Sequence, residues 1–364
     1  MMVSFVEVLK VLIFSRTSEF FVFIWHFTPL SLSLQTVTLK QKAMKNASKM
    51  NETSNRFPIE ENGKCGYIDK EGKMVVNPQF DEANSFSEEG LAVVRIGDEE
   101  SCKWGYIDKE GKYVIKPQFD EAWDFSEGLA MVRIGDKGGY IDKEGKYVIK
   151  PQFGWAWSFS EGLALVRIGD KWGYIDKEGK YVIKPQFDEA CFFSEGLAVV
   201  RIGDEESGKW GFIDKEGKFV INPQFDGALD FFEGLARVEI DGKCGYIDKE
   251  GKYVINPQFD EAWSFSEGLA WVSIGDKWGY IDKEGKMVIN PQFDDAGRFS
   301  EGLAVVRIGD WKSGKYGYID KEGKYVINPQ FDDAWPFSEG LAMVRIDGKY
   351  GYIDKEGKFV WREK

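Results

Sequence analysis

The sequence has little histidine and little cysteine. His26 is the only histidine in 364 residues, which excludes Ser-His-Asp systems, Cys-His systems and histidine metal sites from the rest of the chain. The four cysteines, Cys65, Cys102, Cys191 and Cys244, form no CxxC pair, and their spacing fits neither a zinc site nor a disulfide framework. The sequence therefore predicts no metal site and no cofactor.

The sequence also has fewer positively than negatively charged residues. The chain carries 48 Lys and Arg against 61 Asp and Glu, which gives a formal net charge of −13. A protein that binds nucleic acid non-specifically needs a basic surface, and an anionic membrane surface makes the same demand. We therefore expect no nucleic-acid partner, and membrane contact only through residues 1–43.

One short motif recurs through most of the chain. The motif is Gly-Tyr-Ile-Asp-Lys-Glu-Gly-Lys, and its first glycine falls at Gly66, Gly105, Gly139, Gly173, Gly211, Gly245, Gly279, Gly317 and Gly351. These nine starts give eight full units and a truncated ninth. A fixed period of this length indicates a repeat architecture, in which each unit buries its apolar faces against its neighbours.

The unit has no stretch long enough for paired helices. Its longest run between glycine and proline, from Pro117 to Gly128, leaves ten residues. Glycine and proline in a helix interior cost about 1 and 3 kcal/mol. This excludes a helical hairpin, although such repeats have a similar period, and predicts an all-β unit.

Three short strands are expected in each unit. In the second unit they are 104–108, 112–115 and 129–134, because these runs are rich in β-branched and aromatic residues. The second strand should end before Pro117. The five-residue loop 108–112 suits a turn closed by a left-handed Gly111, and pairs such as Asp241-Gly242 suit a two-residue hairpin turn. The third strand of one unit should therefore form a hairpin with the first strand of the next.

The remaining residues of the unit, 117–128, are expected to form a long connection. Its two phenylalanines, Phe119 and Phe125, recur in every full unit. We expect them to be plugs between neighbouring units, each contributing about 1.5–3 kcal/mol when buried.

The stacked units could form an open or a closed array. We favour an open, twisted β-solenoid, because propellers usually stop at about eight blades. The alternative is a closed, propeller-like ring.

A longer period of three units lies within the short one. Successive core glycines are 39, 34, 34, 38, 34, 34, 38 and 34 residues apart, and the long spacings carry extra residues at 99–102, 205–208 and 311–314. In a solenoid with three units per turn, these enlarged hairpins would line up on one flank. Recent duplication of a three-unit block would explain the same period.

The residues around each core glycine carry a resemblance to a known family. Trp-Gly at Trp104, Trp172, Trp210 and Trp278, followed by Tyr/Phe-Ile-Asp, Pro-Gln-Phe and Phe-Ser-Glu-Gly-Leu-Ala, resembles the WG-repeat family of bacterial proteins over residues 58–364. Tryptophan is replaced at Cys65, Gly138, Cys244, Tyr316 and Tyr350. The resemblance implies a β-rich tandem array of a binding or scaffold class. It carries no catalytic residues over to this chain.

Carboxylates are plentiful, but they repeat. Asp108, Glu110, Asp120, Glu121 and Glu127 have equivalents in nearly every unit. An active site needs one asymmetric environment that separates two pKa values, and similar copies do not single one out. We interpret these residues as turn and loop charges that protect sheet edges, and we expect that the protein is not an enzyme.

The positions that differ between units are more informative. The pair before the second loop phenylalanine varies on a nearly constant frame: Asn84-Ser85, Trp123-Asp124, Trp157-Ser158, Cys191-Phe192, Leu229-Asp230, Trp263-Ser264, Gly297-Arg298 and Trp335-Pro336. Aromatic residues and arginine anchor interfaces. The candidate partner-binding residues are therefore Trp123, Trp157, Phe192, Trp263, Arg298 and Trp335. Alternatively, the pair is an unconstrained loop position whose tryptophans lie on neighbouring aliphatic side chains.

Residues 1–43 do not belong to the repeat. No charged residue occurs from Phe20 to Thr38, so the segment is a membrane span, a signal peptide or an untranslated stretch ahead of a start at Met44 or Met50. Residues 44–57 are expected to be a polar linker, and residues 58–364 the repeat array. The compartment stays open: a cytoplasmic location is slightly favoured, and a genuine segment 1–43 would mean export or membrane anchoring.

Together these features predict a non-catalytic scaffold that binds another protein through a long repetitive surface. The alternative is a glycan-binding or cell-surface adhesion module that uses the loop tryptophans as stacking platforms.

Overall fold

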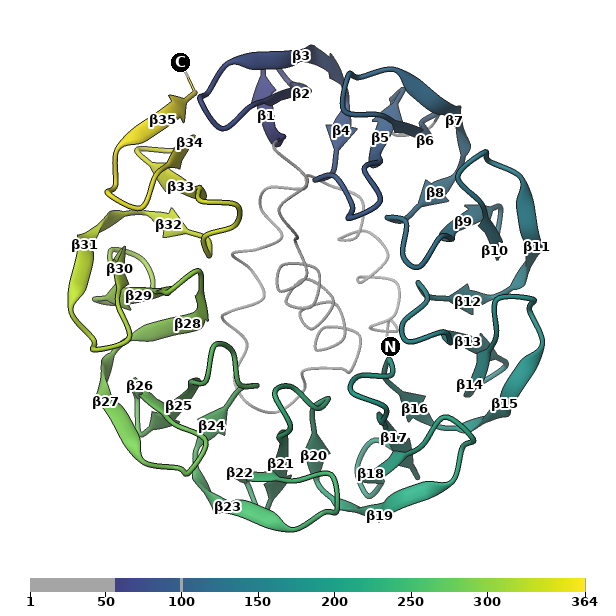
Figure 1. The fold of residues 1–364 in the computed structure, drawn as a ribbon. Coiled ribbons are helices and arrows are strands. Elements are labelled where there is room, and N and C mark those ends of the chain that lie inside the picture. Colours follow the sequence, from purple (N-terminus) through teal and green to yellow (C-terminus); the bar gives the residue numbers. More distant parts are fainter. Residues whose placement is uncertain (1–55, 99–100, 364) are drawn as a thin grey trace, which may run out of the picture.

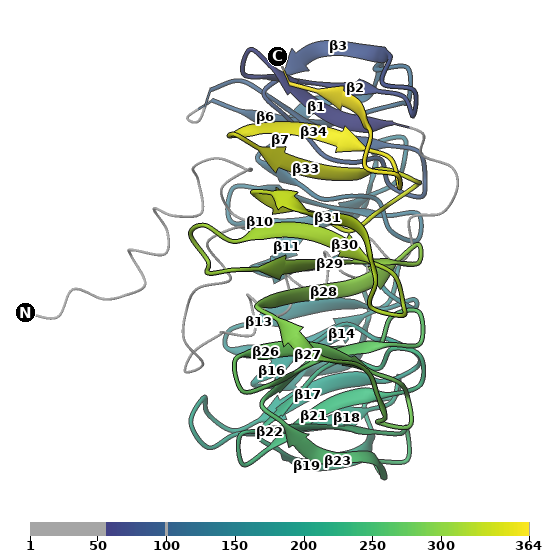
Figure 2. The same cartoon turned by 90° about the vertical axis from the view of Figure 1, so that its left-hand side faces the viewer.

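The chain forms a closed ring of nine blades. The computed structural model describes residues 56–98 and 101–363, and in these residues the strands form nine antiparallel sheets arranged around a central axis (Figure 1). Figure 2 shows the same ring from the side. The predictions for residues 1–43, and for the linker up to residue 55, lie outside the described residues. No helix that could cross a membrane occurs in the part of the chain that is described.

Each blade is a meander whose strands run in order from the axis to the rim. Blade 1 has three strands, β1–β3; blades 2 to 9 have four each, from β4–β7 to β32–β35. The innermost strands are β4 (Glu82–Ala83), β8 (Glu121–Ala122), β12 (Trp155–Ala156), β16 (Glu189–Ala190), β20 (Gly227–Ala228), β24 (Glu261–Ala262), β28 (Asp295–Ser300) and β32 (Asp333–Ala334).

In blades 2 to 9 the second strand begins after the inner turn, and β1, β2 and β3 of blade 1 take the second, third and fourth places of this pattern. The second strands are β1 (Phe57–Glu61), β5 (Ala92–Ile96), β9 (Ala130–Ile134), β13 (Ala164–Ile168), β17 (Ala198–Ile202), β21 (Ala236–Ile240), β25 (Ala270–Ile274), β29 (Leu303–Ile308) and β33 (Ala342–Ile346). The third strands are β2 (Lys64–Ile68), β6 (Lys103–Ile107), β10 (Lys137–Ile141), β14 (Lys171–Ile175), β18 (Lys209–Ile213), β22 (Lys243–Ile247), β26 (Lys277–Ile281), β30 (Lys315–Ile319) and β34 (Lys349–Ile353).

The outermost strands form the rim. They are β3 (Met74–Phe80), β7 (Tyr113–Phe119), β11 (Tyr147–Phe153), β15 (Tyr181–Phe187), β19 (Phe219–Phe225), β23 (Tyr253–Phe259), β27 (Met287–Phe293), β31 (Tyr325–Phe331) and β35 (Phe359–Arg362). The outer strand runs through its proline, so the prediction that it ends before Pro117 was wrong. Proline is tolerated there because the strand lies at the sheet edge and needs no second ladder partner.

The predicted hairpins are confirmed. β9 pairs antiparallel with β10, so the third predicted strand of one unit does join the first predicted strand of the next. Gly111 adopts a left-handed φ of 79°, and Asp241 and Gly242 have φ values of 51° and 68°, as a type I′ turn requires. The core glycine has a different reason to be glycine: a Cβ at Gly105 would lie 2.6 Å from the carbonyl oxygen of Ile115.

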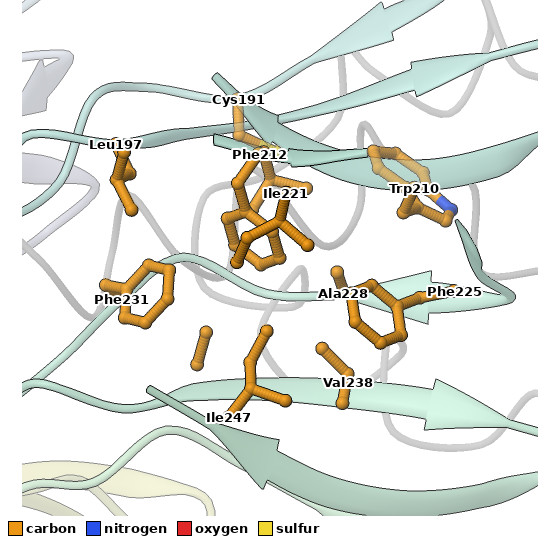
Figure 3. Close-up of a cluster of buried hydrophobic side chains, with 12 residues drawn as sticks. Cys191, Leu197, Trp210, Phe212, Ile221, Phe225, Ala228, Phe231, Val238 and Ile247 are labelled. Atoms are coloured by element: carbon orange, nitrogen blue, oxygen red, sulfur yellow. The ribbon is translucent and has the colours of Figure 1, made fainter. Parts of the chain in front are cut away.

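The apolar core lies between blades rather than within them. Figure 3 shows the cluster between blades 5 and 6, in which Phe212 and Ile221 of one blade pack against Phe231 and Ile247 of the next. Phe119 and Phe125 are buried in the equivalent cluster between blades 2 and 3. Their predicted role as plugs between units is therefore confirmed.

The ring closes where blade 9 meets blade 1, in agreement with the propeller-like alternative rather than the favoured solenoid. Phe57, Ile59 and Ile68 of blade 1 form one buried cluster with Leu341 and Tyr352 of blade 9. The physical reason is that each blade covers the apolar face of its neighbour, and after nine blades the last face meets the first.

The three enlarged hairpins do not line up on one flank. They join β5 to β6, β17 to β18, and β29 to β30, so they belong to blades 2, 5 and 8. In a ring of nine blades these are spaced at thirds of the circumference. The three-unit period therefore produces a pseudo-threefold pattern because the array closes instead of winding.

Candidate interaction surface

The repeated carboxylates take part in regular structural contacts. The Asp108 carboxylate accepts the N–H groups of Glu110 and Lys112 and so shapes the turn between β6 and β7. In the part of the chain that the structure describes, no group of three or more His, Cys, Asp or Glu side chains could hold a metal ion.

A recurring aspartate ties seven of the outer strands to the next blade. Asp81 accepts the Lys64 ammonium at 2.6 Å on one oxygen and the Gly97 N–H at 3.0 Å on the other. The same pair of donors, a lysine ammonium and a backbone N–H, serves Asp81, Asp120, Asp188, Asp226, Asp260, Asp294 and Asp332. At Asp120, the hydrogen bond from Lys103 and then that from the Gly135 N–H lower the pKa of the carboxyl.

The inner turns link the blades near the axis. In Ser126-Glu127-Gly128-Leu129 both central residues have positive φ, 57° and 89°, which defines a type I′ turn. The Glu127 carboxylate accepts the Gly162 N–H of the next blade at 2.9 Å and lies 3.5 Å from the Lys177 ammonium. The Ser126 hydroxyl donates to the carbonyl of Phe159 at 2.8 Å. Each inner turn therefore connects its blade to the next one.

A buried tyrosine makes a further connection. The Tyr106 hydroxyl donates to the carbonyl of Trp123 at 2.9 Å, and the ring of Tyr106 packs against Phe125 with centroids 4.9 Å apart. Trp123 is the first residue of a variable pair. The backbone of that pair is thus held by the frame, while its side chains differ from blade to blade.

The variable pairs meet across blade junctions. The Asn84 amide donates to the Asp124 carboxylate at 3.4 Å, and the rings of Trp157 and Phe192 lie edge to face at 6.1 Å. In both cases the first residue of one blade contacts the second residue of the next blade. The eight variable pairs lie in or directly after the innermost strands of blades 2 to 9, so their positions form a ring beside these strands.

The structure places the six candidate residues in that ring, partly covered. Trp123, Trp157, Trp263 and Trp335 are half-buried. Phe192 is 7% exposed and Arg298 is 8% exposed. Burial lowers the pKa of Arg298 to about 10, although the negative charge of Glu267 acts in the opposite direction and raises it. Trp263 stacks on Trp271 at 5.8 Å. The tryptophans therefore contribute to the blade junctions and leave only part of each ring accessible.

Sequence reasoning missed a cross-strand arginine that recurs in six of the blades. Arg95 pairs with Glu82 at 2.6 Å and lies 6.0 Å from the ring of Trp104. The equivalent arginines 167 and 201 lie over Trp172 and Trp210. The recurrence of Glu, Arg and Trp at fixed offsets was visible in the sequence, but their proximity depends on the pairing of three strands.

One junction departs from this scheme. Between blades 3 and 4, Gly138 replaces the tryptophan, Gly154 replaces the aspartate, and Trp155 replaces the glutamate. Arg133 lies 5.3 Å from the ring of Trp155, so the neighbouring blade supplies the aromatic face that Gly138 lacks. Trp155 is 47% exposed.

The chain belongs to the WG containing repeat family. The family model matches eight tandem segments between residues 66 and 350: 66–99, 104–137, 139–172, 172–205, 210–244, 245–278, 278–310 and 316–350. This confirms the resemblance found in the sequence. No curated protein matches the chain.

Solved structures of low identity share only distant likeness. Hsv2p of Kluyveromyces lactis is 11% identical, with 65% of this chain and 93% of that chain covered and a TM-score of 0.40. A quinonprotein alcohol dehydrogenase-like protein from Bacteroides thetaiotaomicron is 13% identical over 85% of this chain and 75% of that one, with a TM-score of 0.33. The tricorn protease is 10% identical with a TM-score of 0.26; the match covers 84% of this chain and 39% of the protease.

Proposed function

We propose that the protein is a non-catalytic scaffold that binds another protein at the ring of variable pairs beside the inner strands. The observation that supports this is the distribution of variation. Turn, strand and plug positions repeat almost unchanged, whereas the paired positions differ in size, charge and aromatic character. A constant frame with a variable inner ring suits recognition of one irregular partner surface.

Photo-crosslinking from single positions of the full-length chain tests this proposal. A photoreactive amino acid at Asn84, which is exposed on the inner ring, should capture a protein from the producing cells. The matched control is the same amino acid at Val326, which is 47% exposed on β31 at the rim. Equal capture from both positions, or capture from Val326 alone, would contradict the proposal.

Glycan binding is the competing outcome. It would require stacking of a sugar on open tryptophan faces, whereas Trp123, Trp157 and Trp263 are half-buried. Binding to a glycan array that disappears when these three are changed to alanine, with retained folding, would replace the protein-scaffold proposal. Turnover of any substrate by the purified chain would refute the non-catalytic part.

A further inference from the structure

The junction between blades 3 and 4 keeps the donors of the aspartate contact but lacks the aspartate. In the seven regular cases the lysine precedes its aspartate by 17 residues. The backbone N–H follows the aspartate by 16 residues at Asp81 and by 15 residues at the other six. The same offsets from Gly154 give Lys137 and Gly169. Lys137 is as exposed as its counterparts and lies 3.8 Å from the exposed carboxylate of Asp136.

The frame around these donors is unchanged. Gly169 has a φ of 56°, close to the 58° of Gly135 and the 60° of Gly275, whose N–H groups do bind an aspartate. A Cβ added at Gly154 would meet nothing within 4 Å. There is therefore room at position 154 for the first atom of a side chain, where the seven regular junctions carry an aspartate.

A further cation at this junction lacks its regular acidic partner. Trp155 lies opposite Arg167 in the pairing of β12 and β13, where regular blades have a glutamate such as Glu189 opposite Arg201. Arg167 pairs instead with Asp170, which is 96% exposed, at 3.3 Å. Replacement of both acidic residues makes this junction more positive than the regular ones, on a chain whose net charge is negative.

We propose that the space at Gly154 binds a carboxylate from a protein partner, held by the Lys137 ammonium and the Gly169 N–H, with an apolar neighbour of that carboxylate on Trp155. The seven aspartates are internal examples of the bound state: each follows a phenylalanine and enters the same pair of donors. A charge-assisted contact with two converging donors favours a carboxylate over an amide. This deepens the proposed scaffold function and rests on it.

A short peptide that copies the internal ligand tests the inference. The acetylated, amidated peptide Phe-Asp-Glu-Ala would be titrated into full-length protein labelled with ¹⁵N-glycine, with the Gly169 amide signal as readout. We expect saturable shifts and at least tenfold weaker binding of the matched Phe-Asn-Glu-Ala peptide. Binding should weaken with added salt. Equal binding of the two peptides would overturn the inference.

Two variants locate the site. G154D restores the internal carboxylate and should abolish peptide binding, while K137A should weaken it at least fivefold. The matched control is K171A at the next junction, where Asp188 already fills the donors; it should leave binding unchanged. Binding that survives G154D would refute the assignment, and W155E provides a second folded variant in which binding should also be lost.

Two comparisons complete the test: one distinguishes a protein carboxylate from a small free carboxylate, and the other distinguishes failure of this inference from failure of the scaffold proposal. If acetate shifts the Gly169 signal as strongly as the peptide at equal concentration, the ligand is a small free carboxylate, and the assignment to a protein partner is wrong. If crosslinking from Asn84 succeeds while the peptide fails to bind, only this inference fails. If the peptide binds while crosslinking fails, the scaffold proposal fails as placed on the inner ring.

Discussion

Most of the regular junctions, and also the seam between blades 9 and 1, bury a tyrosine that packs on a phenylalanine and donates to a backbone carbonyl. The partners of this tyrosine come from different parts of the blade in the two cases. At a regular junction, the Tyr140 ring packs against Phe159 at 4.9 Å and its hydroxyl donates to Trp157, and both partners belong to an inner loop. At the seam, Tyr352 packs against Phe57 at 5.4 Å and donates to Pro58 at 2.8 Å. These partners belong to β1, a second strand.

The difference shows what closes the ring. In the described residues, blades 1 and 9 form separate sheets. Closure depends on side-chain contacts in which Phe57 replaces the loop phenylalanine and Pro58 replaces the loop carbonyl. The polypeptide runs through every regular junction but not across this seam, so we expect the seam to open first.

Removal of the plug should have the largest effect. Phe159 is 2% exposed and Phe57 is 7% exposed. Phe159→Ala should lower the free energy of unfolding by about 3–5 kcal/mol, measured by urea denaturation. Phe57→Ala should reduce the unfolding midpoint less, because the ring can open at the seam while the other junctions stay folded, and it should increase the hydrodynamic radius.

The control for both substitutions is Val114→Ala on the rim. Val114 is 44% exposed, so this change should stay within about 0.5 kcal/mol. An equal loss of stability for Phe57→Ala and Phe159→Ala, with no change in radius, would mean that the seam does not open separately.

Removal of one hydroxyl should have a smaller effect. Tyr140→Phe leaves the Trp157 carbonyl without this donor and should cost about 1–2 kcal/mol. Tyr352→Phe should cost a similar amount but act at the seam, visible as faster hydrogen exchange in β1. Blade 5 already carries Phe212 at this position, so Phe212→Tyr should be neutral or stabilising. A destabilising Phe212→Tyr would show that the pocket does not accept the hydroxyl there.

Acid should weaken the regular junctions through their aspartates. The hydrogen bond from Lys243, and then that from the Gly275 N–H, lower the folded-state pKa of Asp260 below its ordinary value of 3.8. A carboxyl with a lowered folded-state pKa stabilises the fold above its unfolded value, and this contribution disappears as the pH falls through the folded value. The melting temperature should therefore decrease once the pH is lowered below about 4.

The matched variant for this acid effect is Asp260→Asn. It should lower the melting temperature at pH 6 and have less effect at pH 2.5, where the carboxyl is already protonated. An equal effect at both values would exclude the ionised aspartate as the cause.

Much of the blade could be predicted from the sequence, because its signals are local. Gly111 and the Asp241-Gly242 pair define turns, and the recurring Phe119 and Phe125 define an interface. Closure could not be predicted, because it depends on a small rotation between blades that every junction repeats. The departures at Gly138, Gly154 and Trp155 were readable as substitutions, but only the strand pairing shows that they meet at one junction.

The inner turns provide the smallest test of what a regular junction contributes. Glu127 has a left-handed φ of 57°, which costs about 1 kcal/mol for a residue with a side chain, and its carboxylate gains the Gly162 N–H and Lys177. Glu127→Gly should remove both the backbone cost and the carboxylate contacts, so the free energy of unfolding should change by less than about 1 kcal/mol. In blade 2 the inserted residue lets Glu89 accept the Gly128 N–H at 2.7 Å without a left-handed backbone. Glu89→Ala should therefore be the more destabilising of the two changes in urea denaturation, and the reverse order would mean that the backbone strain at Glu127 is not offset by its contacts.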